Sequence, residues 1–414
     1  MDEQNNKRES LGRLTPLDAS ERLNHIDSLR GFALFGILIV NMLAFQYGTV
    51  GFKFSIPVQS FPNQTTNIII EWLFQGSFYP IFSILFGFGA IIMYERSLSK
   101  THSFNKLFFR RLVLLLIIGF IHKYFIWDGD ILLTYAITGF LFMLFIKRQP
   151  KTLLIWAIVL TALIHSMGIL PEDPDSEIDL QPFVEIEQDV FSTGTYTEVV
   201  THRFTANPYA KADLGIEMDP LEREIFASFM SALTFIMLVL QALILFLLGG
   251  YIAKKRWLHN LKEHRPQLIK LTVIMLTIGI ILKGAMVFTT NNALYYYGYF
   301  IGGPILGIGY ITGFTLLFSK LDSIKIFRGF ALVGRMALTN YLLQSIVMTT
   351  IFYGYGLGLF GKLGTLPGTI LAITFFALQM AISSKWLKHH HYGPMEWLWR
   401  SGTYLKVQAL KRPK

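Results

Sequence analysis

The stretch from Asn24 to Asn41, NHIDSLRGFALFGILIVN, passes from charged to apolar sequence at Arg30. A continuous helix turns 100° and rises 1.5 Å per residue, so Asp27, Arg30 and Asn41 would share an arc of roughly 60° along about 21 Å. Polar groups are costly in hydrocarbon and normally face a protein interior or a cavity. We therefore expect this face to line a site inside a membrane-spanning bundle.

Asp27 and Arg30 also have a simpler interpretation. An acid near a helix start interacts favourably with the helix dipole, and an arginine at the cytoplasmic end follows the positive-inside rule. Position alone is enough to explain both residues. The amide of Asn41, between Val40 and Met42, is harder to explain that way because a buried amide needs a partner.

The composition indicates an all-α polytopic membrane protein. The 414 residues are 52% hydrophobic and only 15% charged, and they include no cysteine, which excludes disulfides, thiolate metal sites and cysteine nucleophiles. Apolar stretches approach the length needed to cross a ~30 Å hydrocarbon core. We expect about ten spans, near 31–50, 74–94, 108–126, 130–147, 152–170, 225–252, 268–288, 296–319, 332–352 and 367–385.

The distribution of charge predicts the orientation. Most of the 37 Lys and Arg fall at the N-terminus, in alternate loops and in the tail, which would all lie on one side of the membrane. The positive-inside rule makes that side cytoplasmic, so both termini are expected in the cytoplasm. Anionic lipid headgroups account for the net charge of +10 without a nucleic-acid partner.

The loop from 171 to 224 holds more than half of the 27 acidic residues and is expected outside. We expect mainly a solvated spacer, with some helix near 180–203. The predicted organisation is then a cytoplasmic tail (1–23), a five-helix half (24–170), the external acidic loop (171–224), a second five-helix half (225–404) and a cytoplasmic tail (405–414).

A second polar cluster falls in the third and fourth predicted spans. Arg111 and His122 are eleven residues apart, so they lie within about 20° of each other on a helix. Asp128 and Asp130 follow in a short external turn, and an imidazole beside a carboxylate can act as a general base with its orienting partner. The alternative is a histidine bonded to a backbone carbonyl and an aspartate that caps the next helix.

Other motifs point to no further chemistry. The chain contains no Walker motif, HExxH or GxSxG. Three adjacent histidines, His389 to His391, lack the helical spacing of metal ligands because neighbouring side chains point in different directions. We expect no metal and no bound cofactor.

The sequence also resembles a known family. The blocks HIDSLRGFALFGILIVN, FRRLVLLLIIGFIH, DILLTYAITG, GRMALTNYLLQS and HYGPMEWLWRSGTY are similar to those of the YeiB-like bacterial membrane proteins, whose C-terminal half is known as domain of unknown function 418. This resemblance covers the chain from about Leu23 to Tyr404. It implies a multi-pass protein of the bacterial cell membrane.

The N-terminal half resembles, more distantly, the transmembrane acyltransferase superfamily, which includes heparan-α-glucosaminide N-acetyltransferase and bacterial sugar O-acyltransferases. Arg22, Asp27, Arg30 and Gly31 loosely fit the entry pattern of its first core helix, R-x-x-x-[IVL]-D-x-x-R-G. That acetyltransferase carries its active histidine about eleven residues after an asparagine equivalent to Asn41. This chain has phenylalanine at that position, so His122 would have to take the role from another helix.

An acyltransferase hypothesis gives each polar residue a role. Arg30, Arg110 and Arg111, with Asp27 beside them, would engage the polyphosphate of a cytoplasmic thioester such as acyl-CoA. Asn41 would stabilise an oxyanion, and His122 with Asp128 or Asp130 would deprotonate a sugar-like acceptor outside. In this hypothesis the catalytic residues are Asn41, His122, Asp128 and Asp130, and the substrate-binding residues are Asp27, Arg30, Arg110 and Arg111.

Two other hypotheses use the same features. Five spans, an external loop and five further spans suit the inverted halves of a secondary transporter or exporter. A non-catalytic assembly partner is the third, and it would have polar faces packed without a cavity. The polar residues concentrate in the first four predicted helices, which favours the acyltransferase.

Overall fold

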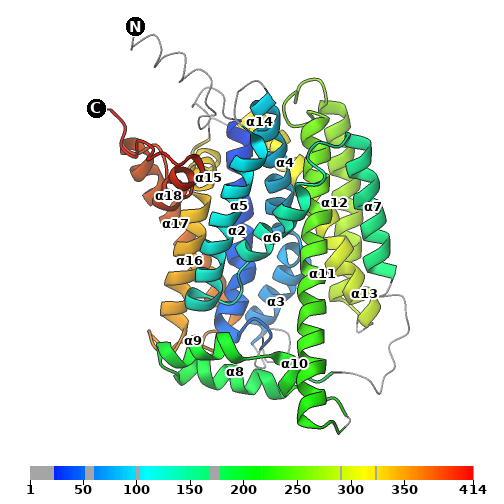
Figure 1. Ribbon diagram of the computed structural model, residues 1–414, viewed down its shortest axis with the longest axis vertical. Coiled ribbons are helices and arrows are strands. Elements are labelled where there is room, and N and C mark those ends of the chain that lie inside the picture. The colour runs from blue at the N-terminus through cyan, green and yellow to red at the C-terminus, as the bar shows by residue number, and fades with distance from the viewer. Residues whose placement is uncertain are drawn as a thin grey trace.

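The computed structural model describes residues 23–51, 60–98, 103–166, 178–215, 217–289, 291–321 and 324–413. The N-terminal tail predicted for 1–23 therefore lies almost wholly outside the described residues, as does the start of the acidic loop. Within the described ranges the chain is helical, and its β-structure consists of two isolated bridges. The helices form a bundle of long, roughly parallel elements (Figure 1).

The first half contains helices interrupted by short π-helical turns. They are α2 (Asn24–Tyr47), α3 (Phe61–Ile69), η3 (Ile70–Phe74), α4 (Phe78–Leu98), α5 (Phe104–Ile121), η4 (His122–Ile126), α6 (Leu132–Phe142) and α7 (Pro150–Ser166). Three shorter helices follow at one end of the bundle: α8 (Gln181–Thr193), α9 (Tyr196–Thr205) and α10 (Pro208–Lys211).

The second half begins with the longest helix of the described chain. Its elements are α11 (Pro220–Lys254), α12 (Arg265–Val287), α13 (Asn292–Tyr297), η7 (Gly298–Gly302), α14 (Gly303–Leu321), α15 (Lys325–Arg335), α16 (Ala337–Phe352), α17 (Thr365–His389) and α18 (Pro394–Tyr404). The chain bends by 87° between α15 and α16.

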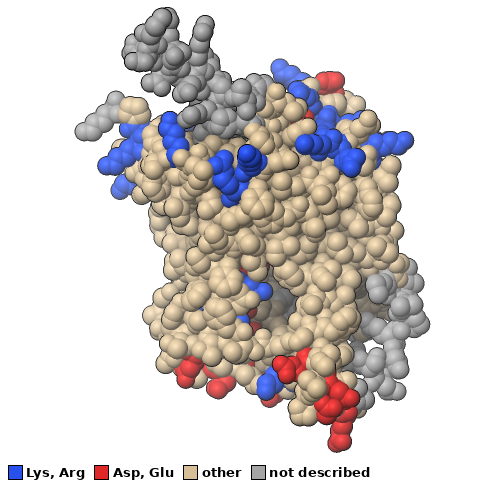
Figure 2. All heavy atoms as spheres, in the orientation of Figure 1, with Lys and Arg blue, Asp and Glu red and all other residues tan. Residues whose placement is uncertain are grey.

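The prediction of a helical chain with apolar helices of membrane-spanning length is confirmed. Six helices of the described residues are long and apolar enough to cross a membrane, or seven if the bent pair α15–α16 counts as one span. The helices α6 and α7 are apolar but shorter. An apolar belt also separates two charged ends of the visible face, with most Lys and Arg at one end and most Asp and Glu at the other (Figure 2).

Close backbone contact fixes α2 against α15. A Cβ atom at Gly31 would collide with the backbone of Phe330, and one at Gly334 would collide with the backbone of Asp27. Glycine is required at such contacts because a side chain would push the helices apart. This contact places the charged end of α2 directly beside Arg335.

The acidic segment is not mainly the solvated spacer expected from its composition. Helices α8 and α9 bury Phe183, Val184, Phe191 and Val199. The ring of Phe191 stacks on Tyr353 with 4.6 Å between ring centroids. Apolar positions at helical spacing within the acidic sequence give α8 an inward face, so the helices cover the end of the bundle.

Candidate functional site

A cavity of about 370 Å³ lies within the bundle, between α2, α4, α5, α16 and α18. Basic side chains line one part of it: Arg30, Arg96, Arg111, Arg335 and Arg400. The remaining lining is mostly aliphatic and aromatic, and includes Leu34, Ile37, Phe82, Leu85, Phe86, Leu115, Ile131, Leu132, Tyr135 and Tyr341. The cavity therefore combines a cationic region with an apolar one.

The polar faces of α2 and α5 point into this common space. Asp27, Arg30, Leu34 and Ile37 follow one another at spacings of three and four residues on α2, and all four line the cavity. On α5, Phe108, Arg111 and Leu115 do the same. The two helix faces therefore meet around one cavity.

The basic region is held by local contacts. The guanidinium of Arg30 donates a hydrogen bond of 2.9 Å to the Asp27 carboxylate. The guanidinium of Arg111 lies 3.8 Å from the centre of a Trp399 ring, and Trp399 Nε1 donates to the Arg111 carbonyl. Arg110, the preceding residue on α5, does not line the cavity. Of the two adjacent arginines predicted to bind substrate, the structure brings only Arg111 to the site.

Helix α18 closes one side of the basic region and is anchored by Glu396. The Glu396 carboxylate accepts hydrogen bonds from the backbone N–H groups of Leu338 and Thr339, at 2.6 and 3.0 Å. These groups belong to the first turn of α16, where unpaired N–H groups need acceptors. Burial raises the pKa of Glu396, while these hydrogen bonds act in the opposite direction. Helix α18 therefore holds Arg400 in place at the cavity.

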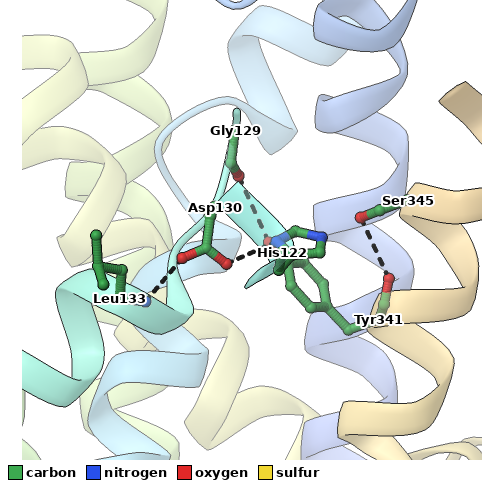
Figure 3. Close-up of polar contacts among 6 residues, drawn as sticks. All are labelled: His122, Gly129, Asp130, Leu133, Tyr341 and Ser345. Atoms are coloured by element: carbon green, nitrogen blue, oxygen red, sulfur yellow. Dashed lines mark hydrogen bonds and ion pairs between the residues drawn. The ribbon is translucent and has the colours of Figure 1, made fainter. Parts of the chain in front are cut away.

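His122 and Asp130 form a buried pair at the end of α5 (Figure 3). The distance from His122 Nδ1 to Asp130 Oδ2 is 2.7 Å, and neither side chain is exposed. Asp130 Oδ1 accepts a second hydrogen bond from the Leu133 N–H, at 2.7 Å. Asp130 therefore does two things that the sequence offered as alternatives: it accepts an N–H of the first turn of α6, and it orients the His122 ring.

This arrangement determines the chemistry available to the imidazole. An ionised carboxylate only accepts hydrogen bonds, so Nδ1 donates to Asp130, and in the neutral ring Nε2 is the nitrogen that carries the lone pair. Nε2 is buried and has no hydrogen-bond partner within the described residues. A neutral imidazole held in this tautomer is suited to accept a proton.

Tyr341 separates His122 from the cavity. The rings of His122 and Tyr341 lie 5.0 Å apart between centroids, and the lining of the cavity includes Tyr341 but not His122. The Tyr341 hydroxyl donates a long hydrogen bond of 3.4 Å to the Gly129 carbonyl. Tyr341 therefore lies next to both His122 and the cavity.

The remaining predicted residues lie elsewhere. Asn41 is half-buried and does not line the cavity, because the lining of α2 ends at Ile37, one turn earlier. Asp128 accepts a hydrogen bond of 2.6 Å from Thr49 Oγ1 and lies near Arg203, with no contact to His122. Among the described residues, no three His, Asp or Glu side chains are grouped as metal ligands.

The comparisons with known proteins agree on a family. A family model described as "Protein of unknown function (DUF418)" matches residues 252–406. The protein YeiB of Escherichia coli is 27% identical over 92% of this chain and 96% of its own length. YxaH of Bacillus subtilis is 36% identical over 97% of this chain and 99% of its own length. The chain belongs to the YeiB-like DUF418 family.

The cavity of this DUF418 protein extends beyond the region that the family model covers. Residues 252–406 include α15, α16 and α18, with Arg335, Tyr341 and Arg400. The first half contributes Arg30, Arg96 and Arg111 to the cavity, and the His122–Asp130 pair lies beside it. The relatives align with nearly the whole chain, including a 39.9 kDa protein from Bacillus acidopullulyticus that is 26% identical over 94% of this chain and 96% of its own length.

Proposed function

We propose that this protein is a membrane acyltransferase that takes the acyl group of a phosphate-bearing thioester from the basic end and passes it to a hydroxyl or amine at the opposite end. The observation that carries the proposal is the composition of the cavity. Its arginines lie at one end, its apolar side chains follow, and Tyr341 separates its interior from a carboxylate-oriented histidine.

The cationic region suits the phosphates of the donor. Guanidinium groups bind phosphate through several directed hydrogen bonds and remain charged under physiological conditions. Arg30, Arg111 and Arg400 approach the cavity from three different helices. Acyl-CoA is a donor with the required chemistry, because it combines phosphates with a thioester-linked apolar chain.

The apolar region suits the acyl group. A volume of about 370 Å³ falls at the small end of the range for ligand pockets, which is roughly 300–1,000 Å³. It would therefore hold part of the donor and leave the nucleotide portion near the basic end. Phe82, Phe86 and Tyr135 would surround the chain as it approaches Tyr341.

The proposed step uses His122 as the base. The acceptor O–H or N–H gives its proton to His122 Nε2 while its heteroatom bonds to the acyl carbon. The carbon–sulfur bond breaks, and the leaving thiolate takes the proton from the imidazolium. Asp130 stabilises the charged ring throughout. Because Tyr341 lies between His122 and the cavity, its side chain must move before the reacting groups meet.

We further propose that the chain crosses a bacterial cell membrane ten times, with the basic end cytoplasmic. The six helices that are long enough alone and the bent pair α15–α16 would supply seven crossings, and α5, α6 and α7 would supply three more. The segregation of charge in Figure 2 supports this orientation through the positive-inside rule. The acidic helices α8 and α9 would then lie outside.

The test is thiol release by full-length protein in lipid nanodiscs, supplied with acetyl-CoA or palmitoyl-CoA and a mixture of sugars and amines. The chain has no cysteine, so every thiol detected comes from the donor. We expect release that depends on acceptor and is lost in His122→Ala. The matched control is His389→Ala, because His389 is an exposed histidine at the end of α17.

The second candidate is a transporter, favoured by the fact that helices from both halves line the cavity. Its signature is substrate flux across sealed vesicles without cleavage of the thioester. Absence of thiol release with every donor and acceptor pair, or release unaffected by His122→Ala, would overturn the acyltransferase proposal.

A further inference from the structure

A lysine lies inside the apolar belt, on the side of the acidic end. Lys123 belongs to η4 and directly follows the buried His122. Its Nζ lies 5.9 Å from the centre of the Phe235 ring on α11 and 5.8 Å from the centre of the Tyr124 ring. Phe235 follows Glu224, the last acid of α11, by eleven residues, which is about 16 Å of helix. The ammonium is therefore held well away from the acidic end of the bundle.

The surface of the protein is hollowed at this level. Figure 2 shows a hollow in the visible face, within the apolar belt and toward the acidic end, with charged atoms exposed inside it. In the same orientation, α11 flanks this position on one side, and α6 and α9 lie on the other (Figure 1). The ammonium of Lys123 lies between η4 and α11, and the residue is partly exposed. Lys123 therefore faces a space that opens from the side of the bundle.

The charge of Lys123 is not neutralised by the described part of the chain. Among those residues Lys123 makes no hydrogen bond and no ion pair, and its contacts are the two aromatic rings. The two acids that follow it are engaged elsewhere, Asp128 with Thr49 and Asp130 with His122. An ammonium offers three donors and is costly in hydrocarbon without a partner. The site therefore calls for an anionic partner.

Two ordinary explanations do not account for Lys123. The topological rule for basic residues places them at one end of the bundle, and Lys123 lies toward the other. A lysine near a helix end can also extend its side chain to reach water. Here the ammonium lies over the ring of Phe235 instead, in the apolar part of α11.

The walls of the hollow change in character along α11. One turn from Phe235 toward the acidic end, Ser231 Oγ donates a hydrogen bond of 2.9 Å to Asn207 Oδ1 of the residue before α10. Just past Phe235 in the other direction, Ile236 and Leu238 are exposed. Polar groups thus lie on one side of the ammonium and apolar surface on the other, as at the boundary between lipid headgroups and acyl chains.

We propose that an anionic glycerophospholipid occupies this hollow, with its phosphate at the Lys123 ammonium. Basic pockets between membrane-spanning helices bind lipid headgroups through charge. The polar headgroup would lie toward Asn207 and Ser231, and the acyl chains would follow the exposed apolar side chains of α5 and α11. A zwitterionic lipid carries its own cation beside the phosphate, which competes with Lys123. The proposal concerns binding and does not rest on the proposed acyltransferase activity.

Photo-crosslinking of the full-length protein in nanodiscs tests the site. The probes are phosphatidylglycerol and phosphatidylcholine with a diazirine at the start of one acyl chain, each added as a trace to the same phosphatidylcholine carrier. Peptide mass spectrometry locates the adducts. We expect adducts within residues 117–126 and 229–239, about fivefold or more with the anionic probe, as one basic residue near the surface predicts. Equal labelling by both probes, which ordinary boundary lipid would give, or no labelling there overturns the proposal.

Three variants connect the labelling to Lys123. Lys123→Met keeps the unbranched stem without the charge, so labelling by phosphatidylglycerol should fall about fivefold, to the level of phosphatidylcholine. Lys123→Arg keeps the charge and should stay within about twofold of wild type. Lys211→Met is the matched control, because Lys211 is an exposed lysine on α10 at the same end of the bundle.

Wild-type labelling in Lys123→Met, or an equal loss in Lys211→Met, overturns the proposal. Loss of an unpaired charge should not destabilise the fold, and thermal unfolding checks this. Lys123→Gln, which also lacks the charge, decides if Lys123→Met does not fold.

The lipid site and the proposed function fail separately. Labelling needs no thioester, so absence of thiol release leaves the lipid site in place. Equal labelling by the two probes removes the lipid site and leaves the acyltransferase proposal as it was.

Discussion

The imidazole of His122 and the ring of Tyr341 lie 5.0 Å apart, and of the two only Tyr341 lines the cavity. The carboxylate-oriented base is therefore adjacent to the cavity but closed off from it. The Tyr341 hydroxyl donates a long hydrogen bond to the Gly129 carbonyl and also interacts with the Ile131 backbone. Each neutral hydrogen bond contributes about 0.5–1.5 kcal/mol, which sets the scale of the cost of moving this end of the side chain.

Removing the Tyr341 ring should expose the base to the cavity. We expect Tyr341→Ala to raise thiol release in the absence of any acceptor, by about tenfold or more, because water can then reach His122. Tyr341→Phe keeps the ring and should stay near the wild-type rate. The measurement is acceptor-free thiol release, and equal rates in the two variants would contradict the proposed separation.

Replacing Asp130 should impair catalysis while preserving the helix start. In Asp130→Asn, the amide oxygen can still accept from Leu133, whereas the amide nitrogen cannot accept the Nδ1 proton. His122 is then driven toward the wrong tautomer, and the rate should fall by about 10²–10⁴-fold, the usual contribution of a positioned base. Acceptor-dependent thiol release measures the loss. Circular dichroism should show unchanged helicity, and a rate close to wild type would remove Asp130 from the mechanism.

The basic region should act on donor affinity. We expect Arg111→Gln to raise KM for acyl-CoA about tenfold with little change in kcat, because hydrogen bonds to charged groups contribute about 1.5–3 kcal/mol. Arg110→Gln is the matched control, since Arg110 carries the same charge but does not line the cavity. Initial rates over a range of donor concentration separate the two parameters. An equal effect of both variants would show that only net charge matters.

Ionisation of Glu187 should loosen the external helices as pH rises. Its pKa is raised to about 8 when folded, so the folded state binds more protons than the unfolded state below that pH, and stability falls as pH rises toward 8. Burial lowers the pKa of His202 and raises the pKa of Tyr353. The other charged groups near Glu187 are Asp128 and Arg203.

Hydrogen exchange followed by mass spectrometry measures this effect on residues 181–205. Between pH 6.5 and 8.5, after correction for intrinsic exchange, protection should fall several-fold in the wild-type protein. Glu187→Gln should remove the dependence and raise protection at pH 8.5. A variant that keeps the wild-type slope would assign the pH dependence to another group.

The contact between α2 and α15 should be intolerant of added volume. Gly31→Ala places a methyl group against the backbone of Phe330, which cannot move as a flexible side chain can. Overpacking of this kind costs about 1–3 kcal/mol, so the thermal unfolding temperature should fall. Gly284→Ala is the control, because its added Cβ meets only ordinary contacts with Trp72. Similar unfolding temperatures for the two variants would show that the helices can separate at little cost.

The sequence correctly predicted the inward face of α2 but not how far the cavity extends along it. Asp27 and Arg30 both line the cavity, as their shared arc predicts. Asn41 continues the same spacing one turn beyond Ile37, where the lining has ended. Helical periodicity specifies direction around an axis, whereas the depth of a cavity depends on which neighbours fill it.

Helix packing, which local sequence does not specify, also explains why some cavity residues were not predicted. Arg96, Arg335 and Arg400 join Arg30 and Arg111 only because α4, α15 and α18 pack around one space. Each follows the topological rule for basic residues, so nothing local distinguishes it. Glu187 and Arg203 were hidden in an acidic segment that looked solvated, although the buried Phe183 and Val184 were a usable signal.

One carboxylate serves both the local fold and the imidazole. Asp130 receives the Leu133 N–H through one oxygen and His122 Nδ1 through the other. Unfolding of the first turn of α6 would therefore move Asp130 and break its hydrogen bond to His122. The imidazole would then lose its fixed orientation and tautomer, so in the proposed mechanism local unfolding of α6 would switch the base off.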